Sequence, residues 1–489
     1  MYIIHVASEF ANVAKVGGLA DVVQGLTREL SIRGNHVEVI MPRYDCMRMD
    51  RIWGYTKSYS DLWVPYHHFW VHCDVYFGFV DGVKVYFIEP HFFKNFFSRG
   101  IVYGHKDDPE RFAFFSKAAL EFMLKTGKHP DIIHVHDWQS ALVPVLLYET
   151  YSKFGMTHPR VCFTIHNIHH QGVTGDFVLR QNHLNPAHYI TNDRLGDDRY
   201  HGAVNLMKGG VVYSNFVTTV SPTYMNEIRH STLGHGLQGV LNHHGNKLGG
   251  VLNGIDYGEW NPEVDRFIPH KYSAANLDAK YANKKALRDR FWLADNFKPI
   301  VAVVSRLDHQ KGVALIRHAI FYCLANGCQF VLLGTSPDQK VSEDFWNLKR
   351  HLNDNPDVHL ELAFDEGLSH LIYAGADMIL IPSAFEPCGL TQLIGMKYGT
   401  VPVVRNTGGL ADTVFDANYA HVPYQDRTGY VFNDFNNEGM ESALKRAIGM
   451  WHHYPQYWRE LVLNGMRKDY SWSHSAQHYL NIYELIREK

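Results

Sequence analysis

The sequence predicts an α/β protein with two doubly wound, Rossmann-like domains. The first observation is length, because the 489 residues exceed the roughly 250–300 at which a single hydrophobic core stops growing. The second is that short apolar strands alternate with helical segments, a pattern typical of parallel sheets with right-handed crossovers. The third is a stretch rich in Gly, Asn, Asp and Pro at 250–267, where this alternation stops before it resumes.

In the first half, a strand over residues 2–7 leads into a helix whose apolar residues recur at helical spacing, and Gly34 ends that helix. Ligands of open α/β folds bind at the carboxyl ends of the strands. The polar and Gly/Pro residues that follow each strand are therefore the expected location of the functional site. Further strands are predicted over 36–42, 83–90, 131–137, 160–167 and 216–222.

The same pattern returns after the break, and the final residues have the apolar spacing of an amphipathic helix. We therefore expect an N-terminal domain over 1–252, a C-terminal domain over 253–462, and a helical segment over 463–489 that packs back on the N-terminal domain. The strands of the C-terminal domain are predicted over 299–307, 329–336, 358–364, 377–383 and 400–406.

Composition excludes several classes of protein. The 47 basic and 50 acidic side chains leave a net charge of −3, without the basic excess of a nucleic-acid-binding protein. No apolar run approaches the roughly 20 residues of a membrane span. Six scattered Cys residues do not form a disulfide framework. We expect a cytoplasmic protein without membrane or nucleic-acid partners, or one of the plastid stroma if the chain comes from a photosynthetic eukaryote.

The sequence Gly-Gly-Leu-Ala-Asp occurs twice, at 17–21 and at 408–412, and the first copy follows Lys15 closely. A Gly-Gly turn at a helix start lets the backbone approach an anion, and the helix end supplies N–H groups. A turn that only reverses the chain explains the pattern equally well. We expect both copies to begin helices at the carboxyl edges of two similar domains.

Two further motifs follow predicted strands of the second half. Arg306 and Lys311 are close enough in sequence to converge on one anion such as a diphosphate, although a solvated basic turn is the simpler interpretation. Glu386 lies in a Pro/Gly-bounded loop that leads into a helix near Leu390, where it can accept hydrogen bonds from hydroxyl groups or merely solvate the turn. Cys388 has no identifiable partners for nucleophilic catalysis.

In the first half, Asp137 and His166 each end a predicted strand, where a carboxylate or imidazole can meet a sugar. The neighbouring His169 and His170 lack the carboxylates of a metal site, and the chain has no Asp-x-Asp motif. The sequence therefore predicts no metal.

Together and in this order, the motifs resemble the family of bacterial glycogen synthases and plant starch synthases, which are retaining glucosyltransferases of the GT-B fold. The similarity covers nearly the whole chain and is greatest to the class III/IV starch synthase branch. The matching segments include KVGGLADVV (15–23), HVHDWQSALVP (134–144), TIHNIHHQG (164–172), SRLDHQKG (305–312) and PSAFEPCGLTQL (382–393).

The resemblance implies that two Rossmann-like domains face a central cleft. It also implies that glucose passes from ADP-glucose to the non-reducing end of an α-1,4-glucan, with ADP-glucose as co-substrate and no cofactor. It places Tyr398 near the donor by analogy. The implied catalytic residues are Lys15, Asp137, His166, Arg306, Lys311 and Glu386. The implied donor-binding residues are Lys15, Gly17, Gly18, Asp21, Asn253, Arg306, Lys311, Cys388, Gly389, Leu390 and Thr391.

Other functions stay open at this point. The main alternative is another GT-B glycosyltransferase, either one that uses UDP-glucose or one of sucrose type. A glycan phosphorylase shares the broad architecture but needs a lysine-bound pyridoxal phosphate, for which no motif is present. A non-catalytic glucan-binding protein is disfavoured because the charged residues of the motifs are intact.

Overall fold

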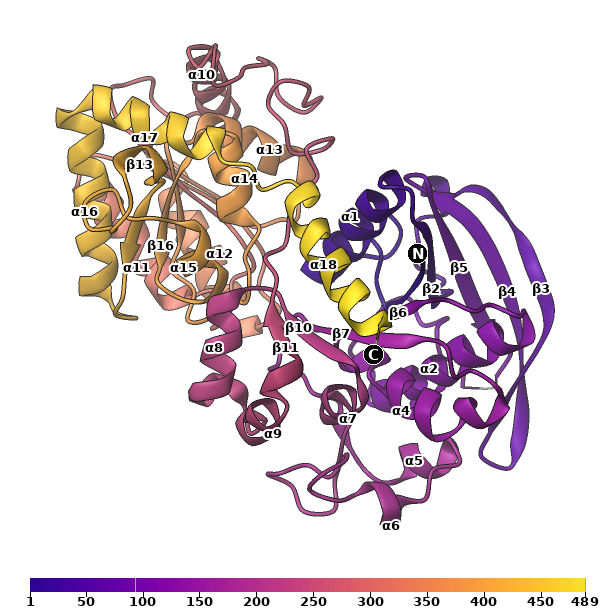
Figure 1. Cartoon of the computed structure of the whole chain (residues 1–489). Coiled ribbons are helices and arrows are strands. Elements are labelled where there is room, and N and C mark those ends of the chain that lie inside the picture. The colour runs from indigo at the N-terminus through magenta and orange to yellow at the C-terminus, as the bar shows by residue number, and fades with distance from the viewer. Residues whose placement is uncertain (93, 489) are drawn as a thin grey trace. The chain divides into compact units, whose positions relative to one another are not determined.

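The protein consists of two compact units. The structure, a computed structural model, describes residues 1–92 and 94–488 (Figure 1). One unit comprises Met1–Gly254 with Trp472–Lys489, and the other comprises Ile255–Ser471. These divisions fall later in the chain than the expected boundaries after 252 and 462. Helix α17 (Pro455–Arg467) continues through residue 463, because its buried face packs on the core of the second unit.

A nine-stranded sheet forms the centre of the first unit, in the order β11-β10-β7-β6-β1-β2-β5-β4-β3. Neighbouring strands are parallel except at the β3–β4 and β4–β5 pairs. The bounds are β1 Tyr2–Val6, β2 His36–Pro42, β3 Trp53–Tyr66, β4 Phe69–Val80, β5 Val83–Pro90, β6 Ile132–His136, β7 Arg160–Ile165, β10 Phe216–Thr219 and β11 Leu248–Gly250; β8 Val173–Thr174 and β9 Val204–Asn205 form a separate pair.

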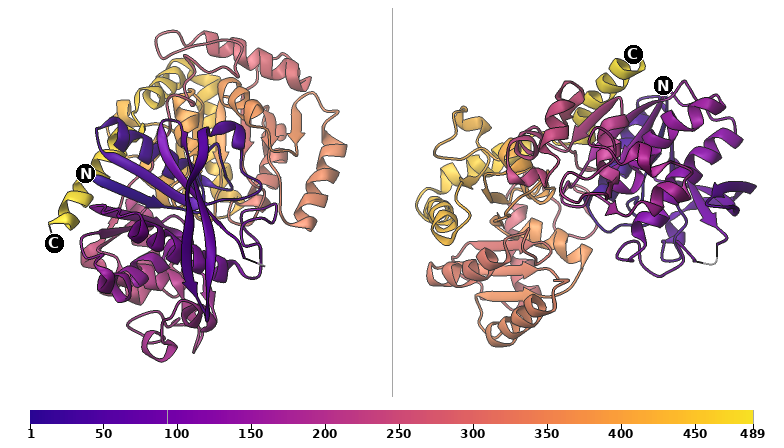
Figure 2. Two further views of the ribbon diagram at one scale, coloured as in Figure 1. Left: turned by 90° about the vertical axis from the view of Figure 1, so that its right-hand side faces the viewer. Right: turned by 90° about the horizontal axis from the view of Figure 1, so that it is seen from below.

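The long β3–β4 hairpin is absent from the sequence prediction, although β2 and β5 have the predicted bounds. Strand β3 lies at the sheet edge, and most of its residues are exposed or half-buried. Its pairing with β4 also shifts register at several points. Because apolar and polar residues do not alternate cleanly along β3, the period-2 signal of a half-buried strand is lost. The left view of Figure 2 shows these long strands.

Helices cover both faces of this sheet. Helix α18 packs against α1 and β7, in a core cluster that contains Ile3, Ile132 and Cys162 (Figure 1). Phe163, the next residue of β7, faces α7 on the opposite side. The bounds are α1 Gly18–Ile32, α2 Asp108–Lys125, α3 Asp137–Ser140, α4 Leu142–Glu149, α5 Phe177–Gln181, α6 Pro186–Tyr189, α7 Leu206–Tyr213, α8 Pro222–His230, α9 Gln238–His243 and α18 Trp472–Arg487.

The C-terminal helix α18 thus belongs to the first unit. Trp472 lies so close to α1 that a Cβ atom on Gly25 would come within 1.9 Å of the indole nitrogen, which explains why α1 carries glycine at that position. Arg33 at the end of α1 donates a hydrogen bond of 2.7 Å to the Gln477 side chain. Burial of the apolar side of α18 in this core cluster stabilises its attachment to the first unit.

The second unit contains a six-stranded parallel sheet in the order β14-β13-β12-β15-β16-β17, with one extensive hydrophobic core around it. The strands are β12 Ile300–Val304, β13 Gln329–Leu333, β14 Val358–Glu361, β15 Met378–Ile381, β16 Val401–Arg405 and β17 Tyr430–Phe432. The helices are α10 Ala279–Phe291, α11 Val313–Ala325, α12 Gln339–Leu352, α13 Glu366–Gly375, α14 Thr391–Lys397, α15 Gly408–Thr413, α16 Asn437–His453 and α17.

Both units are doubly wound, as the sequence predicts. In each sheet the strand order reverses direction at one point, between β1 and β6 in the first unit and between β12 and β15 in the second. The loops at the carboxyl ends of these strands form the crevice in which open α/β folds bind ligands. The two reversal points therefore locate the candidate site within each unit.

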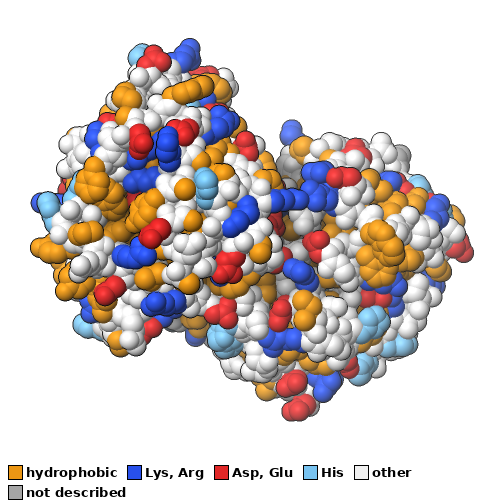
Figure 3. All heavy atoms as spheres, turned by 90° about the horizontal axis from the view of Figure 1, so that it is seen from above, with side chains coloured by type: hydrophobic (Ala, Val, Ile, Leu, Met, Phe, Trp, Pro, Cys, Tyr) orange, Lys and Arg blue, Asp and Glu red, His pale blue; other side chains and the backbone are white. Residues whose placement is uncertain are grey.

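The surface is of mixed charge. Figure 3 shows Lys and Arg side chains interspersed with Asp and Glu on one face of the molecule. Among the described residues, no helix combines the length and apolar character needed to cross a membrane.

Candidate active site

The first Gly-Gly turn connects β1 to α1 at the reversal point of the first unit. Residues 15–18 are exposed, and a Cβ atom on Gly17 or Gly18 would have no other atom within 4 Å. Lys15 extends over the start of α1, where its Nζ lies 2.7 Å from Asp21 Oδ1. The loop thus presents a cation and open backbone at a helix N-terminus, an arrangement suited to an anion.

The buried carboxylate of Glu9 holds the backbone of this turn in place. Glu9 Oε2 accepts hydrogen bonds from the backbone N–H groups of Val16 (2.6 Å) and Gly17 (2.9 Å). Its other oxygen accepts a hydrogen bond of 2.8 Å from the Tyr103 hydroxyl. Burial raises the pKa of Glu9, although these hydrogen bonds oppose the shift. Because the Gly17 N–H already donates to Glu9, it is not available to a ligand. Gly17 can still contribute by letting a ligand come close to its backbone, since it has no side chain.

Asp137 begins α3 directly after β6 and is buried. Its Oδ1 accepts hydrogen bonds from the backbone N–H groups of His166 (2.7 Å) and Asn167 (3.3 Å). Burial nevertheless raises the pKa of Asp137 to about 7. The backbone φ is +52°, a left-handed conformation that costs energy in a residue other than glycine and that is often found at functional sites.

The His166 ring is next to Asp137, at the end of β7. It is buried, and burial lowers its pKa to about 3. His166 Nε2 lies 3.0 Å from His136 Nδ1, so one side of the ring is held by a second histidine. His166 is therefore a neutral, oriented imidazole.

Asn253 lies at the end of the first unit. Its side-chain oxygen is buried and has no hydrogen-bond partner among the residues that the structure describes. A buried polar atom without a partner is costly, so this oxygen is suited to a partner from outside the chain.

In the second unit, Lys311 and Glu386 meet at the reversal point. Lys311 follows β12 and Glu386 follows β15, and Lys311 Nζ lies 2.9 and 2.7 Å from the two carboxylate oxygens. The Ser383 hydroxyl donates a further bond of 2.8 Å to Glu386 Oε2. Residues predicted as separate phosphate and sugar contacts thus form one ion pair, in which the carboxylate is buried and the ammonium still reaches water.

The other predicted residues of this unit are close in sequence to Lys311 or Glu386, but they differ in how exposed their side chains are. Arg306 is exposed, and its guanidinium lies 3.5 Å from Asp308. Cys388 is buried, and Gly389 has a φ of +73°. Leu390 and Thr391 are half-buried at the start of α14.

Tyr398 does not lie at this edge of the sheet. It follows the opposite end of α14, where it is fully buried. Its hydroxyl donates a hydrogen bond of 2.5 Å to Asp265 Oδ2. The assignment of Tyr398 near a donor is wrong, because its side-chain hydroxyl is used within the core of the second unit.

The second Gly-Gly turn has a different role from the first. Gly408 has a φ of +47°, and a Cβ atom there would lie 1.9 Å from the Glu386 carbonyl oxygen. The Gly409 N–H donates a hydrogen bond to that same oxygen at 3.1 Å. These glycines therefore let the turn pack on the backbone of the Glu386 loop, whereas those of the first copy face open space.

Comparison with known proteins decides the family. Residues 2–243 match the model of the starch synthase catalytic domain, and residues 286–460 match that of glycosyl transferases group 1. The chain is 64% identical to glycogen synthase 1 of Nitrosococcus oceani, over the full length of both proteins. The chain belongs to the glycogen synthase and starch synthase family. It is also 61% identical to glycogen synthase 2 of Methylococcus capsulatus, over 99% of this chain and all of that protein.

Solved structures agree with this placement. The catalytic domain of starch synthase IV from Arabidopsis thaliana, bound to ADP and acarbose, matches with a TM-score of 0.97 and 42% identity. The match covers all of this chain and 99% of that one. The predicted family and the fold class of two Rossmann-like domains are confirmed.

Sequence reasoning missed three side chains that contact the candidate residues of the first unit, directly or through one another. Glu9 lies in the loop just after β1, and a carboxylate near the end of a strand is a signal that could have identified it. His5 and His136 stand inside apolar strands, where a histidine usually belongs to the core. Only their spatial neighbours reveal that they connect to His166.

Proposed function

We propose that this enzyme transfers glucose from ADP-glucose to the non-reducing end of an α-1,4-glucan, with retention of the α configuration. The observation that carries the proposal is the Lys311–Glu386 pair at the strand reversal point of the second unit. A buried carboxylate suits sugar hydroxyls, and a cation beside it suits the phosphate from which the sugar departs. The relative bound to ADP and acarbose supports a nucleotide and a glucan-like sugar as ligands.

The charges fit the chemistry of the transfer. Breaking the bond between glucose and phosphate builds positive charge on the sugar ring and negative charge on the leaving diphosphate. Arg306 and Lys311 neutralise the diphosphate, and Thr391 adds a hydroxyl at the start of α14. Since no carboxylate among the described residues is assigned as a nucleophile, the acceptor attacks from the same face, assisted by the leaving phosphate.

Residues of the first unit have their own proposed roles. Lys15 and the exposed Gly17–Gly18 turn bind the donor, while Asp137 and His166 contact the glucose that is transferred. Asn253 offers its buried oxygen to the donor. ADP-glucose is the co-substrate, no further cofactor takes part, and the cytoplasm is the proposed location.

The proposal is tested by nucleoside diphosphate release from ADP-glucose and from UDP-glucose, each with and without maltooligosaccharide. We expect ADP release that depends on the acceptor. The matched control is Glu386→Gln, which keeps the size of the side chain and its hydrogen-bonding oxygen but removes the charge that holds Lys311. Release in this variant should fall about 100-fold or more, as for loss of one preorganised electrostatic contact.

A UDP-glucose-dependent GT-B enzyme is the alternative. Release of UDP from UDP-glucose, without ADP release from ADP-glucose, would overturn the donor assignment. The proposed neutralisation of the leaving diphosphate by Arg306 and Lys311 would still hold. Absence of release from both donors would contradict the proposed activity.

Glu9 should control donor binding through the Lys15 loop. In Glu9→Ala, the N–H groups of Val16 and Gly17 lose their acceptor, and we expect kcat/KM for ADP-glucose to fall about 10- to 100-fold, mainly through KM. Glu9→Gln keeps an acceptor oxygen and should lose less than tenfold. Steady-state kinetics of both variants with maltooligosaccharide in excess measure this. Equal losses in the two would contradict a positioning role and indicate that the charge itself matters.

A further inference from the structure

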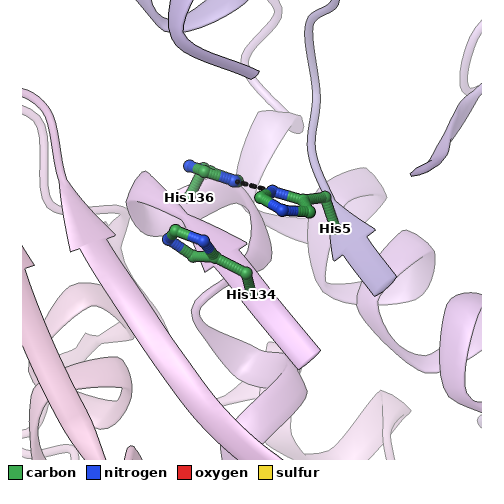
Figure 4. A group of neighbouring side chains, drawn as sticks. All are labelled: His5, His134 and His136. Atoms are coloured by element: carbon green, nitrogen blue, oxygen red, sulfur yellow. Dashed lines mark hydrogen bonds between the residues drawn. The ribbon is translucent and has the colours of Figure 1, made fainter. Parts of the chain in front are cut away.

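Buried histidines connect three neighbouring strands of the first unit and lead to His166, one of its proposed site residues. His5 on β1, His136 on β6 and His166 after β7 form a chain in which His5 Nδ1 lies 3.0 Å from His136 Nε2. His136 Nδ1 in turn lies 3.0 Å from His166 Nε2. We call these three residues the histidine relay. Figure 4 shows the His5–His136 contact, with His134 beside it.

The geometry favours hydrogen bonding over metal binding. His5, His134 and His136 place nitrogen atoms within 4.8 Å of one another. However, the rings of His134 and His136 are stacked at 4.3 Å and 24°, and those of His5 and His136 at 5.3 Å and 17°. Imidazole lone pairs lie in the ring plane, so stacked rings cannot direct them at one ion.

His134 is also committed elsewhere. Its Nδ1 lies 2.6 Å from the Tyr483 hydroxyl and its Nε2 lies 2.7 Å from the Thr164 hydroxyl. Both nitrogens of His136 belong to the relay. A metal would have to break these contacts, so His134 packs beside the relay and does not join its hydrogen bonds.

Each ring of the relay carries one proton at neutral pH. Burial lowers the pKa of His5 and of His166 to about 3, and that of His136 well below its ordinary value. A neutral imidazole has one N–H donor and one acceptor nitrogen. The two hydrogen bonds must therefore point in the same direction along the relay, and the proton position on any ring determines the other two.

The far end of the relay decides that direction. His5 Nε2 is buried and has no hydrogen-bond partner among the described residues. An unpaired buried N–H is rarer and costlier than an unpaired acceptor, so the proton of His5 belongs on Nδ1. His5 then donates to His136 Nε2, and His136 donates from Nδ1 to His166 Nε2.

We propose that His5 and His136 are positioning residues that hold His166 in the tautomer with its proton on Nδ1. The ring then presents an N–H donor, and its plane is held by the bond that Nε2 accepts. A donor at this position can bind a sugar hydroxyl oxygen throughout the transfer, whereas the other tautomer would offer only a lone pair. The consequence for catalysis rests on the proposed function, in which His166 contacts the transferred glucose.

The tautomer itself can be measured without activity. In protein labelled with ¹⁵N-histidine, long-range ¹H–¹⁵N correlations identify which ring nitrogen carries the proton, and the signals lost in His166→Gln assign the ring. We expect the His166 proton on Nδ1 in the unmodified enzyme. A proton on Nε2 would overturn the proposal.

Substitutions at His5 and His134 test whether the His166 tautomer affects the rate of glucosyl transfer. His5→Leu removes the first donor, so we expect mixed tautomers at His166 and a kcat about tenfold lower, with KM for the donor little changed. His5→Asn restores an N–H at the level of Nδ1 and should recover most of kcat. His134→Leu, the matched control, removes a ring from the same cluster but leaves the relay intact, so it should keep both tautomer and kcat.

The outcomes separate the two proposals. If His5→Leu leaves both the His166 tautomer and kcat unchanged, the relay has no positioning role. If His5→Leu does not fold, the unmodified enzyme and His5→Asn still decide the tautomer. If no nucleotide sugar is turned over, the proposed function fails, but the NMR result still tests the relay.

Discussion

Lys311→Ala is expected to lower kcat/KM for glucosyl transfer about 100- to 1,000-fold, because it removes a cation from the leaving phosphate. It should also destabilise the protein by about 2 kcal/mol, since Glu386 stays buried without its counter-ion. This is less than the roughly 3–5 kcal/mol lost on breaking a fully buried ion pair, because the Lys311 side chain reaches water. Steady-state kinetics and denaturant unfolding measure the two effects.

Lys284→Ala is the matched control for this variant. Lys284 Nζ lies 2.7 Å from Asp377 Oδ2 in a buried pair of the same unit. Asp377 directly precedes β15, whereas Glu386 follows it, so the control pair lies at the opposite edge of the sheet. We expect Lys284→Ala to lose stability but keep kcat. Equal loss of kcat in both variants would show that the Lys311 effect comes from instability alone.

Asp137→Asn is expected to make the enzyme more stable but much less active. The pKa of Asp137 in the folded protein, about 7 because of burial, lies above its ordinary 3.8. Between these values the folded state holds a proton that the unfolded state has lost, so folding stability falls as pH rises through this window. The penalty is complete above pH 7 and amounts to at most about 4 kcal/mol.

Asparagine removes this charge but keeps an acceptor for the N–H groups of His166 and Asn167, and it tolerates a positive φ. The stability gain should therefore be greatest at pH 8 and disappear near pH 4. If the carboxylate acts on the transferred glucose, kcat should fall about 100-fold. Denaturant midpoints at several pH values, together with kcat at pH 8, measure both effects.

Asp74→Asn is the control, because the pKa of Asp74 is shifted in the opposite direction from that of Asp137. Burial raises the pKa of Asp74, but hydrogen bonds from Lys57 and His91 outweigh it and lower the pKa overall. Its ionised form therefore stabilises the fold above pH 4, and the asparagine variant should be less stable at pH 8. A stability gain for Asp137→Asn that did not depend on pH would contradict the electrostatic explanation.

The accuracy of the sequence prediction followed the strength of the local signal. Strands β2 and β5 are buried apolar runs bounded by turn residues, and their ends were predicted correctly. The exposed β3 and the short β17 carry little periodic signal and were missed. The end of the second domain was placed too early, because the packing of α17 on its core is a long-range effect.

The sequence by itself determined the two doubly wound domains, the family and the order of the motifs, because short-range periodicity and motif spacing are properties of contiguous residues. Only the tertiary structure decided how those residues pair. Lys311 and Glu386 are far apart in the chain yet form one ion pair, and the two Gly-Gly turns differ in whether another backbone packs on them. The direction of the histidine relay depends on one buried nitrogen of His5, since burial and partner identity arise only when distant strands meet.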